Sequence, residues 1–323
     1  MADLITVTSG TAGNVGSTAA ELQTYFYAKM LNVAEFNTIL KQFGEMAPLP
    51  ERSSLTIKFN RLEKFSTTAS PSQLTQGVPP DADGLTINEF SAVVEQYGKL
   101  VRISEIAELT AKHPLIEATI NRLGLHFAET YDILIYNVLD AATNEYRPNA
   151  RAADTDLIGT DRPAYVDLVE LNALLVVAGA RPLGANGNYP FITSPQPYAS
   201  LQQDPDWKAS NQFAAASKIW RGQVGELANF DVVRSNSPAF AVTSQAGAGD
   251  ADKVYSSFAL GSGAFQVSDL QPMEMSVVAP GGHSDPLKQS YKLGYKFMFK
   301  SVITNQAWIR RVRTAGLNSV TNP

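Results

Sequence analysis

Apolar and polar side chains alternate in three stretches of the chain, residues 53–65, 88–106 and 290–303. A period of two is typical of strands that bury one face. In the third stretch, aromatic and apolar side chains take one face and lysines take the other: Tyr291, Leu293, Tyr295, Phe297 and Phe299 against Lys292, Lys296 and Lys300. We therefore predict a long strand with a buried aromatic face and an exposed basic face. Gly98, inside the second stretch, predicts a bulge or a bend.

Apolar side chains recur at helical spacing in residues 18–44, 113–144 and 162–180. The second stretch is the longest, and Pro114 suits the first turn of a helix. Its apolar stripe contains Ile116, Ile120, Leu123, Phe127, Leu134, Val138 and Ala141. A helix of this length spans about 45 Å, so it predicts a backbone helix that crosses one domain. For the third stretch we predict a cap at Asp161 and an end near Gly179.

The remaining segments mix strands and helices without a regular alternation. Residues 191–207 predict a strand and then a proline-interrupted turn, and residues 209–227 predict a helix and a loop. Residues 229–235 predict a further strand, and residues 253–268 predict a strand pair. Because no βαβ repeat is present, the pattern favours an α+β fold over a doubly wound sheet.

A polar stretch of 24 residues, 66–89, connects the first two predicted strands. A connection of this length is uncommon inside a compact domain and is usually functional or disordered. An isolated hairpin is only marginally stable in water. We therefore expect the hairpin to lie on another body, such as a neighbouring subunit, and a disordered surface loop remains the alternative.

Residues 1–19, rich in Thr, Ser, Gly and Ala, predict a mobile arm.

The composition excludes several kinds of site. The 323 residues include three histidines and no cysteine, which rules out disulfides, thiolate metal ligands and a cysteine nucleophile. The N-terminus does not have the pattern of a signal peptide, and no apolar run reaches the ~20 residues of a membrane span. We therefore expect a protein that is not in a membrane.

Charge is distributed unevenly along the chain. The net charge is −5, which argues against tight binding of nucleic acid. After Asp285 no acidic residue occurs, while seven basic residues do: Lys288, Lys292, Lys296, Lys300, Arg310, Arg311 and Arg313. A basic tail is thus joined to an acidic body.

Three constellations could carry chemistry, and each has a simpler interpretation. His283, Ser284 and Asp285 are the residue types of a hydrolytic triad, but consecutive side chains diverge and no G-x-S-x-G motif is present, so we interpret them as a turn. His126, Glu129 and Asp132, three apart on the longest helix, are interpreted as a solvated helix face rather than a metal site. Lysines and aromatics on opposite faces of residues 290–303 cannot form a stacking platform for bases. The glycine clusters match no nucleotide-binding motif. We therefore predict no catalytic residue, cofactor or metal.

Several segments, taken in order from Tyr25 to Arg313, carry a resemblance to a known family: YFYAKML, KQFGEMAPLPERSSLTIKFNRLEKF, LTQGVPPDADGLT, EQYGKLVRISEIAEL, LHFAETYDILIYNVLDAATN, SPQPYASLQQDPDW, IWRGQVGEL and APGGHSDPLKQSYKLGYKFMFKSVITNQAWIRRV. Their order and spacing resemble phage major capsid proteins of the family typified by the capsid of bacteriophage N-four. That family has the Hong Kong 97-type shell fold.

The resemblance implies five regions. They are an N-terminal arm and helix in 1–45, an extended hairpin loop in 46–97, a peripheral domain with a long spine helix in 98–160, an axial domain in 161–264, and a return to the peripheral domain in 265–323. The spine helix is implied to use Ile116, Ile120, Leu123, Phe127 and Leu134. The hairpin loop is implied to contact the adjacent subunit through Leu74, Thr75, Gly77, Val78, Pro79 and Leu85.

The resemblance also implies a function: a non-enzymatic subunit that assembles into hexamers and pentamers of an icosahedral phage head around double-stranded DNA. Implied partners are other copies of the chain, portal, scaffold or decoration proteins, and DNA contacted weakly and without sequence specificity. Assembly would take place in the host cytoplasm. Lys58 and Lys64 lie at the base of the loop and 66–87 has no lysine, so we do not expect a loop-lysine crosslink, and the short polar arm does not predict a large cleaved scaffold domain. A cargo-enclosing shell of the same fold and, more distantly, a Ser/His hydrolase are the alternatives.

Overall fold

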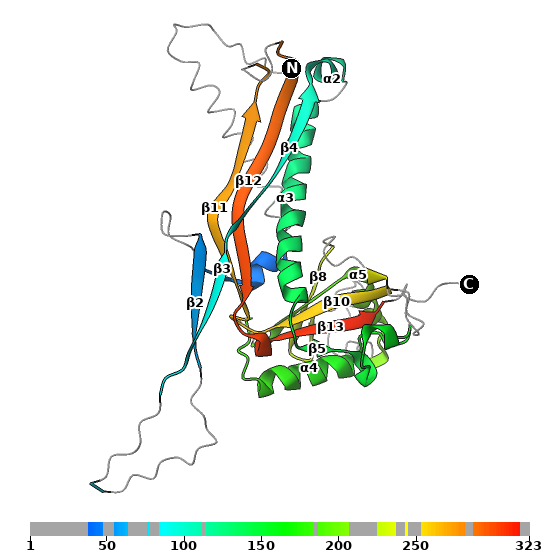
Figure 1. Ribbon diagram of the computed structural model, residues 1–323. Helices are drawn as coiled ribbons and strands as arrows, with labels where there is room; N and C mark the ends of the chain where they lie inside the picture. Colours follow the sequence, from blue (N-terminus) through cyan, green and yellow to red (C-terminus); the bar gives the residue numbers. More distant parts are fainter. Residues whose placement is uncertain are drawn as a thin grey trace.

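The computed structural model describes residues 38–47, 55–63, 76–77, 84–111, 114–183, 187–206, 225–236, 243–244, 253–281 and 287–316. Two sheets, one long helix and a projecting hairpin organise this part of the chain (Figure 1). The fold class is α+β, as the sequence predicts.

The first sheet has four strands in the order β1-β11-β12-β4. They are β1 (Glu45–Met46), β11 (Phe265–Val278), β12 (Ser290–Ile303) and β4 (Glu95–Ser104). The predicted strand at 290–303 is therefore confirmed with the same bounds. β12 is antiparallel to both long neighbours, β11 and β4.

Helix α3 (Leu115–Asp140) runs along this sheet (Figure 1). Its buried positions follow a spacing of three or four residues: Ile120, Leu123, Phe127, Tyr131, Ile135 and Leu139. They meet the aromatic face of β12, where the rings of Phe127 and Phe297 contact edge to face with centroids 5.0 Å apart. The rings of Tyr131 and Phe299 are 4.4 Å apart between centroids. The stripe and the strand face are both apolar, so packing them together removes both from water.

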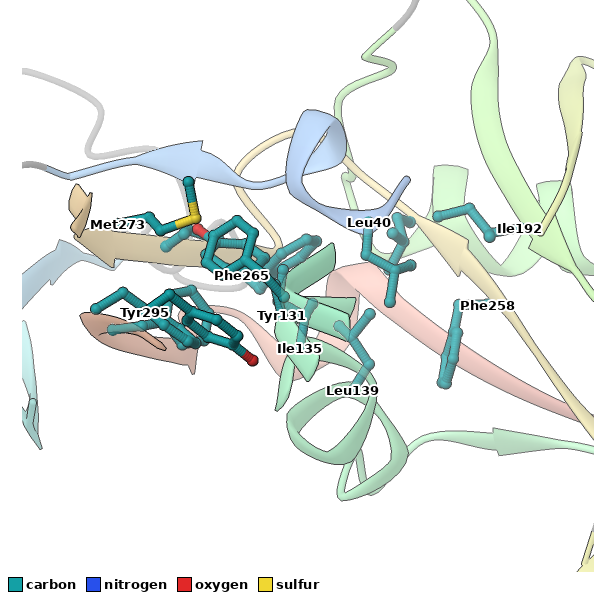
Figure 2. Close-up of a cluster of buried hydrophobic side chains, with 14 of the residues drawn as sticks. Leu40, Tyr131, Ile135, Leu139, Ile192, Phe258, Phe265, Met273 and Tyr295 are labelled. Atoms are coloured by element: carbon teal, nitrogen blue, oxygen red, sulfur yellow. The ribbon is translucent and has the colours of Figure 1, made fainter. Parts of the chain in front are cut away.

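One hydrophobic core contains side chains of α3 and of both sheets. Figure 2 shows Leu40, Tyr131, Ile135 and Leu139 between strands of the first sheet and Phe258 of the second. Short elements flank the helix: the 3₁₀ helix η1 (Leu40–Phe43) and the helix α2 (Glu105–Thr110). Of the helix predicted at 18–44, only residues 38–44 lie within the described part of the chain, and there the turn is 3₁₀.

The second sheet has seven strands, ordered β5-β13-β10-β6-β8-β7 with β9 beside β10. Its strands are β5 (Glu145–Tyr146), β13 (Ile309–Ala315), β10 (Lys253–Leu260), β6 (Tyr189–Thr193), β8 (Phe230–Arg234), β7 (Glu226–Leu227) and β9 (Thr243–Ser244). Helices α4 (Tyr165–Val177) and α5 (Pro195–Gln203) pack on it. The 3₁₀ turns η2 (Pro148–Ala150), η3 (Asp154–Asp156) and η5 (Gln306–Trp308) lie in its connections.

The third unit is a two-stranded hairpin of β2 (Thr56–Leu62) and β3 (Ile87–Val93). Its antiparallel register runs without a break from Thr56 opposite Val93 to Leu62 opposite Ile87. Figure 1 shows it extending away from the body, on the side opposite the second sheet. The long alternating stretch at 88–106 is therefore two strands, β3 and β4, separated at Val94.

Four local predictions were wrong. Gly98 marks no bulge: β4 keeps a regular register with β12, and a Cβ at Gly98 would lie 2.6 Å from the carbonyl oxygen of Tyr295. Asp161 does not cap α4, whose N-cap is Ala164. The proline-containing stretch after β6 is the helix α5, since Pro195 and Pro197 stand in its first turn, where a missing N–H costs nothing.

The fourth concerns the strand pair predicted in residues 253–268. Both strands exist, but β10 pairs with β13, β6 and β9, while β11 pairs with β12 and β1. The chain thus passes from one sheet to the other between Leu260 and Phe265. The prediction at Gly179 was right: it has a φ of 68° and ends α4, with the N–H of Ala180 donating to the carbonyl of Leu175 over 3.0 Å.

Truncating the aromatic face of β12 tests the packing that holds α3 on the sheet. We expect Phe297→Ala to lower the free energy of unfolding by about 3–5 kcal/mol, because it leaves a cavity beside Phe127 and Tyr131. Lys296→Ala on the opposite face is the matched control, and it should cost less than about 1 kcal/mol. Denaturant unfolding of the purified chain measures both, and equal losses would contradict the assignment of the two faces.

Candidate assembly surfaces

The hairpin has one face against the body and one face exposed. Ile57, Phe59 and Val94 are buried in a small cluster with Leu270 and Met298 of the first sheet. At its base, the body on which the hairpin lies is therefore the first sheet of the same chain. Near the two ends of the hairpin, five apolar side chains stay exposed: Leu55, Leu62, Leu85, Ile87 and Val93. Leu62 and Ile87, which pair across the two strands, are 63% and 55% exposed. A strand pair with apolar side chains on both faces is suited to lie between two bodies.

Polar contacts fix the direction in which the hairpin leaves the body. The guanidinium of Arg61 donates to the carbonyl oxygen of Thr304 over 2.9 Å and also contacts Glu63. That contact is the main cause that lowers the pKa of the Glu63 carboxyl below its usual value. Within the hairpin, Lys58 of β2 pairs with Glu89 of β3 at 2.6 Å. Lys64 lies outside the described residues.

The interface residues predicted in the loop are only partly placed. Gly77 is exposed, and its φ of 86° is one that a side chain disfavours. Leu85 is exposed just before β3. Leu74, Thr75, Val78 and Pro79 lie outside the described residues. The loop contact therefore stays a prediction.

The residues predicted on the spine helix share one face of α3. Ile120, Leu123 and Phe127 are buried, and Ile116 and Leu134 are partly buried against the same core. Val138 and Ala141, also named in the stripe, lie near the end of the helix, with Ala141 as its C-cap. The rigid helix and sheet together provide the frame from which the hairpin extends.

Asp132 binds the backbone of the chain at Ile39 and Leu40, just before β1. Its carboxylate accepts hydrogen bonds from the backbone N–H groups of Ile39 and Leu40, each over 3.2 Å, and its side chain is completely buried. Beside it, Asp269 of β11 accepts from Lys41 over 3.1 Å and from the hydroxyl of Tyr131 over 3.0 Å. Because the Asp132 carboxylate is out of water, the pKa of Asp132 rises to about 6, although the N–H groups of Ile39 and Leu40 oppose the shift.

The interpretation of His126, Glu129 and Asp132 as one solvated face was wrong. His126 lies against Tyr295, with its Nδ1 2.6 Å from the tyrosine hydroxyl, whereas Glu129 is exposed and Asp132 is buried. The three side chains do not converge, and no group of three His, Asp or Glu in the described ranges could hold a metal ion. The sequence does carry a signal for Asp132, since it stands four residues after Ala128 and three before Ile135, within the buried stripe.

The lysines of β12 are not a free basic face. Lys296 pairs with Glu274 of β11 at 3.0 Å, and Lys300 pairs with Glu95 of β4 at 3.1 Å. Lys292 is half-buried. The strand therefore places each of these two cations beside an acid of a flanking strand, which the sequence alone does not reveal.

The arginines of β13 are also paired with acids. Arg311 contacts Glu145 and lies 3.8 Å from Asp140, while Arg313 pairs with Asp140 at 3.0 Å. Asp140 is the last residue of α3, so this cluster ties the end of the helix to the second sheet. The basic tail seen in the sequence is thus largely neutralised inside the subunit. His283, Ser284 and Asp285 lie outside the described residues.

Solved structures that resemble this subunit are shells. The capsid of Ralstonia phage GP4 matches with a TM-score of 0.62 at 14% identity, over 89% of this chain and 93% of that one. The capsid of cyanophage P-SCSP1u matches with a TM-score of 0.60 at 17% identity, over 86% and 88%. A virus-like particle from Pyrococcus furiosus matches with a TM-score of 0.53 at 12% identity, over 90% and 99%. No curated protein sequence matches the chain.

The long helix on a four-stranded sheet, the second sheet and the projecting hairpin form the Hong Kong 97-type fold, as the sequence resemblance implied. The profile of one family, described as phage capsid protein, matches residues 88–298. The chain belongs to this family and is a structural subunit of a phage capsid. None of the helices in the described part of the chain is long and apolar enough to cross a membrane.

The buried carboxyl of Asp132 predicts a pH dependence of stability. Its pKa in the folded chain, about 6, lies above the ordinary 3.8 of the unfolded chain. Its contribution is therefore fully present below the unfolded value and is lost as the pH rises through about 6. Lowering the pH from 7 to 5 should therefore raise the free energy of unfolding by about 1 kcal/mol through this group. Asp132→Asn should remove that part of the pH response in denaturant unfolding of the unassembled subunit, and an unchanged response would contradict the assignment.

Proposed function

We propose that this chain is the major capsid protein that forms hexamers and pentamers of an icosahedral shell around double-stranded DNA. Membership in the phage capsid protein family carries the proposal. The exposed apolar side chains of the hairpin support it, because they need a second body to cover them and another copy of the chain is the body that a shell supplies.

The regions implied by the resemblance give the subunit its working parts. We place 98–160 and 265–323 in a peripheral domain, 161–264 in an axial domain near the centre of each capsomer, and 46–97 across the adjacent subunit. The second sheet takes β5 from residues 98–160 and β13 from residues 265–323, so the two domains share strands at their junction. Residues 1–45 act as an arm whose end is fixed by Asp132.

The charges of the subunit are suited to a container for DNA. Each phosphate that a lysine or arginine neutralises adds salt-dependent affinity, and a wall that bound the duplex tightly would hinder its movement. Lys296, Lys300, Arg311 and Arg313 are each paired with an acid of the subunit itself. We therefore propose weak contact with DNA that is independent of sequence. Portal and scaffold or decoration proteins are further partners, the host cytoplasm is the place of assembly, and the subunit needs no catalytic residue or cofactor.

Electron microscopy of the purified chain tests the proposal. We expect closed particles or ring-shaped capsomers, and packaged DNA inside particles formed during infection. A chain that stays monomeric at every concentration and salt condition, with or without scaffold, would overturn the assembly proposal. Particles that enclose an enzyme instead of DNA would favour the cargo-enclosing alternative.

Deleting residues 68–86 tests the role of the hairpin tip. The deletion leaves residues 63–67 to close the turn between Leu62 and Ile87, which already pair. A five-residue connection is a usual length for a hairpin, so the subunit should keep its free energy of unfolding within about 1 kcal/mol. Shells should be absent in sedimentation and in micrographs. Normal shells from the deleted chain would show that the tip is not an assembly contact.

Substitutions on the two faces of the hairpin separate assembly from folding. Leu62→Asp with Ile87→Asp changes the exposed face, and we expect normal thermal unfolding but at least tenfold fewer particles. Phe59→Ala on the buried face is the counterpart, and it should lower the free energy of unfolding by about 3 kcal/mol. Sedimentation and calorimetry measure the two effects, and particles at the wild-type yield from the double variant would refute the proposed contact.

A further inference from the structure

Helix α4 has two apolar stripes on opposite sides. One consists of Leu168, Leu171 and Leu175, which are buried with Tyr189, Phe191, Phe230 and Val312 in the core of the second sheet. The other, half a turn away, consists of Val166, Val169, Ala173 and Val177, at the helical spacing of three and four. A helix on the surface of a lone globular protein carries polar residues on its outer face. The outer stripe of α4, meaning these four residues, does not follow that rule.

The outer stripe is well exposed and almost without charge. Val177 is 86% exposed and Val166 is 57% exposed, and Leu174 and Val176 at the sides of the stripe are exposed as well. Along α4 only Glu170 is both charged and exposed. Beyond the helix the left-handed turn at Gly179 leads to Leu183, which is also exposed. A contiguous apolar surface of this kind usually marks an interaction site.

Contacts at both ends hold the helix in a fixed position. At the start, Asp167 accepts from the N–H of Ala164 over 2.9 Å, and Asp204 accepts from the N–H of Tyr165 over 2.7 Å. At the end, the indole N–H of Trp308 donates to the carbonyl of Ala178 over 3.3 Å. The surface is thus formed before any partner arrives, so little conformational entropy is lost when it binds.

Two other kinds of partner do not fit this surface. Nucleic acid requires lysine or arginine beside its phosphates, and α4 contains neither. A helix that lies on a lipid surface has lysine or arginine along its polar side, which α4 lacks for the same reason. Asp167 and Glu170, which both lie within hydrogen-bond distance of the hydroxyl of Tyr146, would repel phosphate of either source.

We propose that the outer stripe of α4 packs against a second copy of this chain within the capsomer. The inference rests on the proposed assembly function and adds a contact that the hairpin does not provide. Every subunit of the shell presents this stripe, and the partner available to each subunit in equal number is another subunit. The centre of a protein interface is depleted of charge, as this stripe is, and Ala173 in its middle permits close approach. A stable interface needs about 800 Å² from each side, so α4 supplies one part of a larger contact.

Charged substitutions on the stripe test the contact. Val169→Glu with Val177→Glu should leave thermal unfolding of the unassembled subunit unchanged, because both side chains point away from the core. The yield of particles or capsomers should fall at least tenfold. Glu170→Gln is the matched control on the same surface, since glutamine keeps an acceptor for Tyr146, and it should assemble at the wild-type yield. Assembly of the double variant at the wild-type yield would overturn the inference while leaving the proposed function intact.

A single thiol reports on the stripe directly. The chain has no cysteine, so Val177→Cys carries the only reactive thiol. In dilute subunits a small maleimide should label it fast, and in particles or capsomers assembled from the purified chain alone the rate should fall at least tenfold. Equal labelling in both forms would overturn this inference alone, and protection that appears only when a different phage protein is added would show that a second copy is not the partner. A chain that never self-associates would overturn both this inference and the proposed function.

Discussion

The packing of the aromatic face of β12 on the apolar stripe of α3 is the contact on which the rest of the subunit depends. Phe127 and Tyr131 lie over Phe297 and Phe299, and the same helix meets Phe258 of the second sheet through the ring of Tyr136. Because interiors are close-packed, a rigid helix that packs against two sheets fixes the position of one sheet relative to the other. The hairpin and α4 therefore extend from a single frame.

Charged side chains inside the subunit serve mainly to join its segments. Asp132 binds the backbone at Ile39 and Leu40, and the cluster around Asp140 ties α3 to β13. Burial makes the ionised form of Asp132 costly and raises its pKa, although the two backbone N–H donors oppose that shift. Ion pairs on β12 likewise use its lysines within the subunit. The contact surfaces proposed on the hairpin and on α4 instead carry exposed apolar side chains.

Strong local periodicity predicted the main frame from the sequence. The alternation in 290–303 gives β12 with the same bounds, and the stripe from Ile116 to Leu134 gives the helix that the structure places at Leu115–Asp140. Local pattern could not assign β10 and β11 to different sheets, because strand pairing joins residues far apart in the sequence. Of the predicted loop interface, the structure places Gly77 and Leu85, and the contact itself remains a prediction.

The sequence by itself determined the class of fold, the long helix, the basic and aromatic strand and the family resemblance, because each depends on the order and period of neighbouring residues. Only the tertiary structure decided what individual polar and apolar residues do. The local pattern predicts that Asp132 lies on a solvated face, whereas in the structure the chain near Leu40 covers it. The local pattern also predicts a bend at Gly98, whereas in the structure the backbone of Tyr295 lies close to this glycine. The sequence contains both apolar stripes of α4, and only the structure shows that the second sheet covers just one of them. Burial is a property of long-range packing, and a local pattern does not contain it.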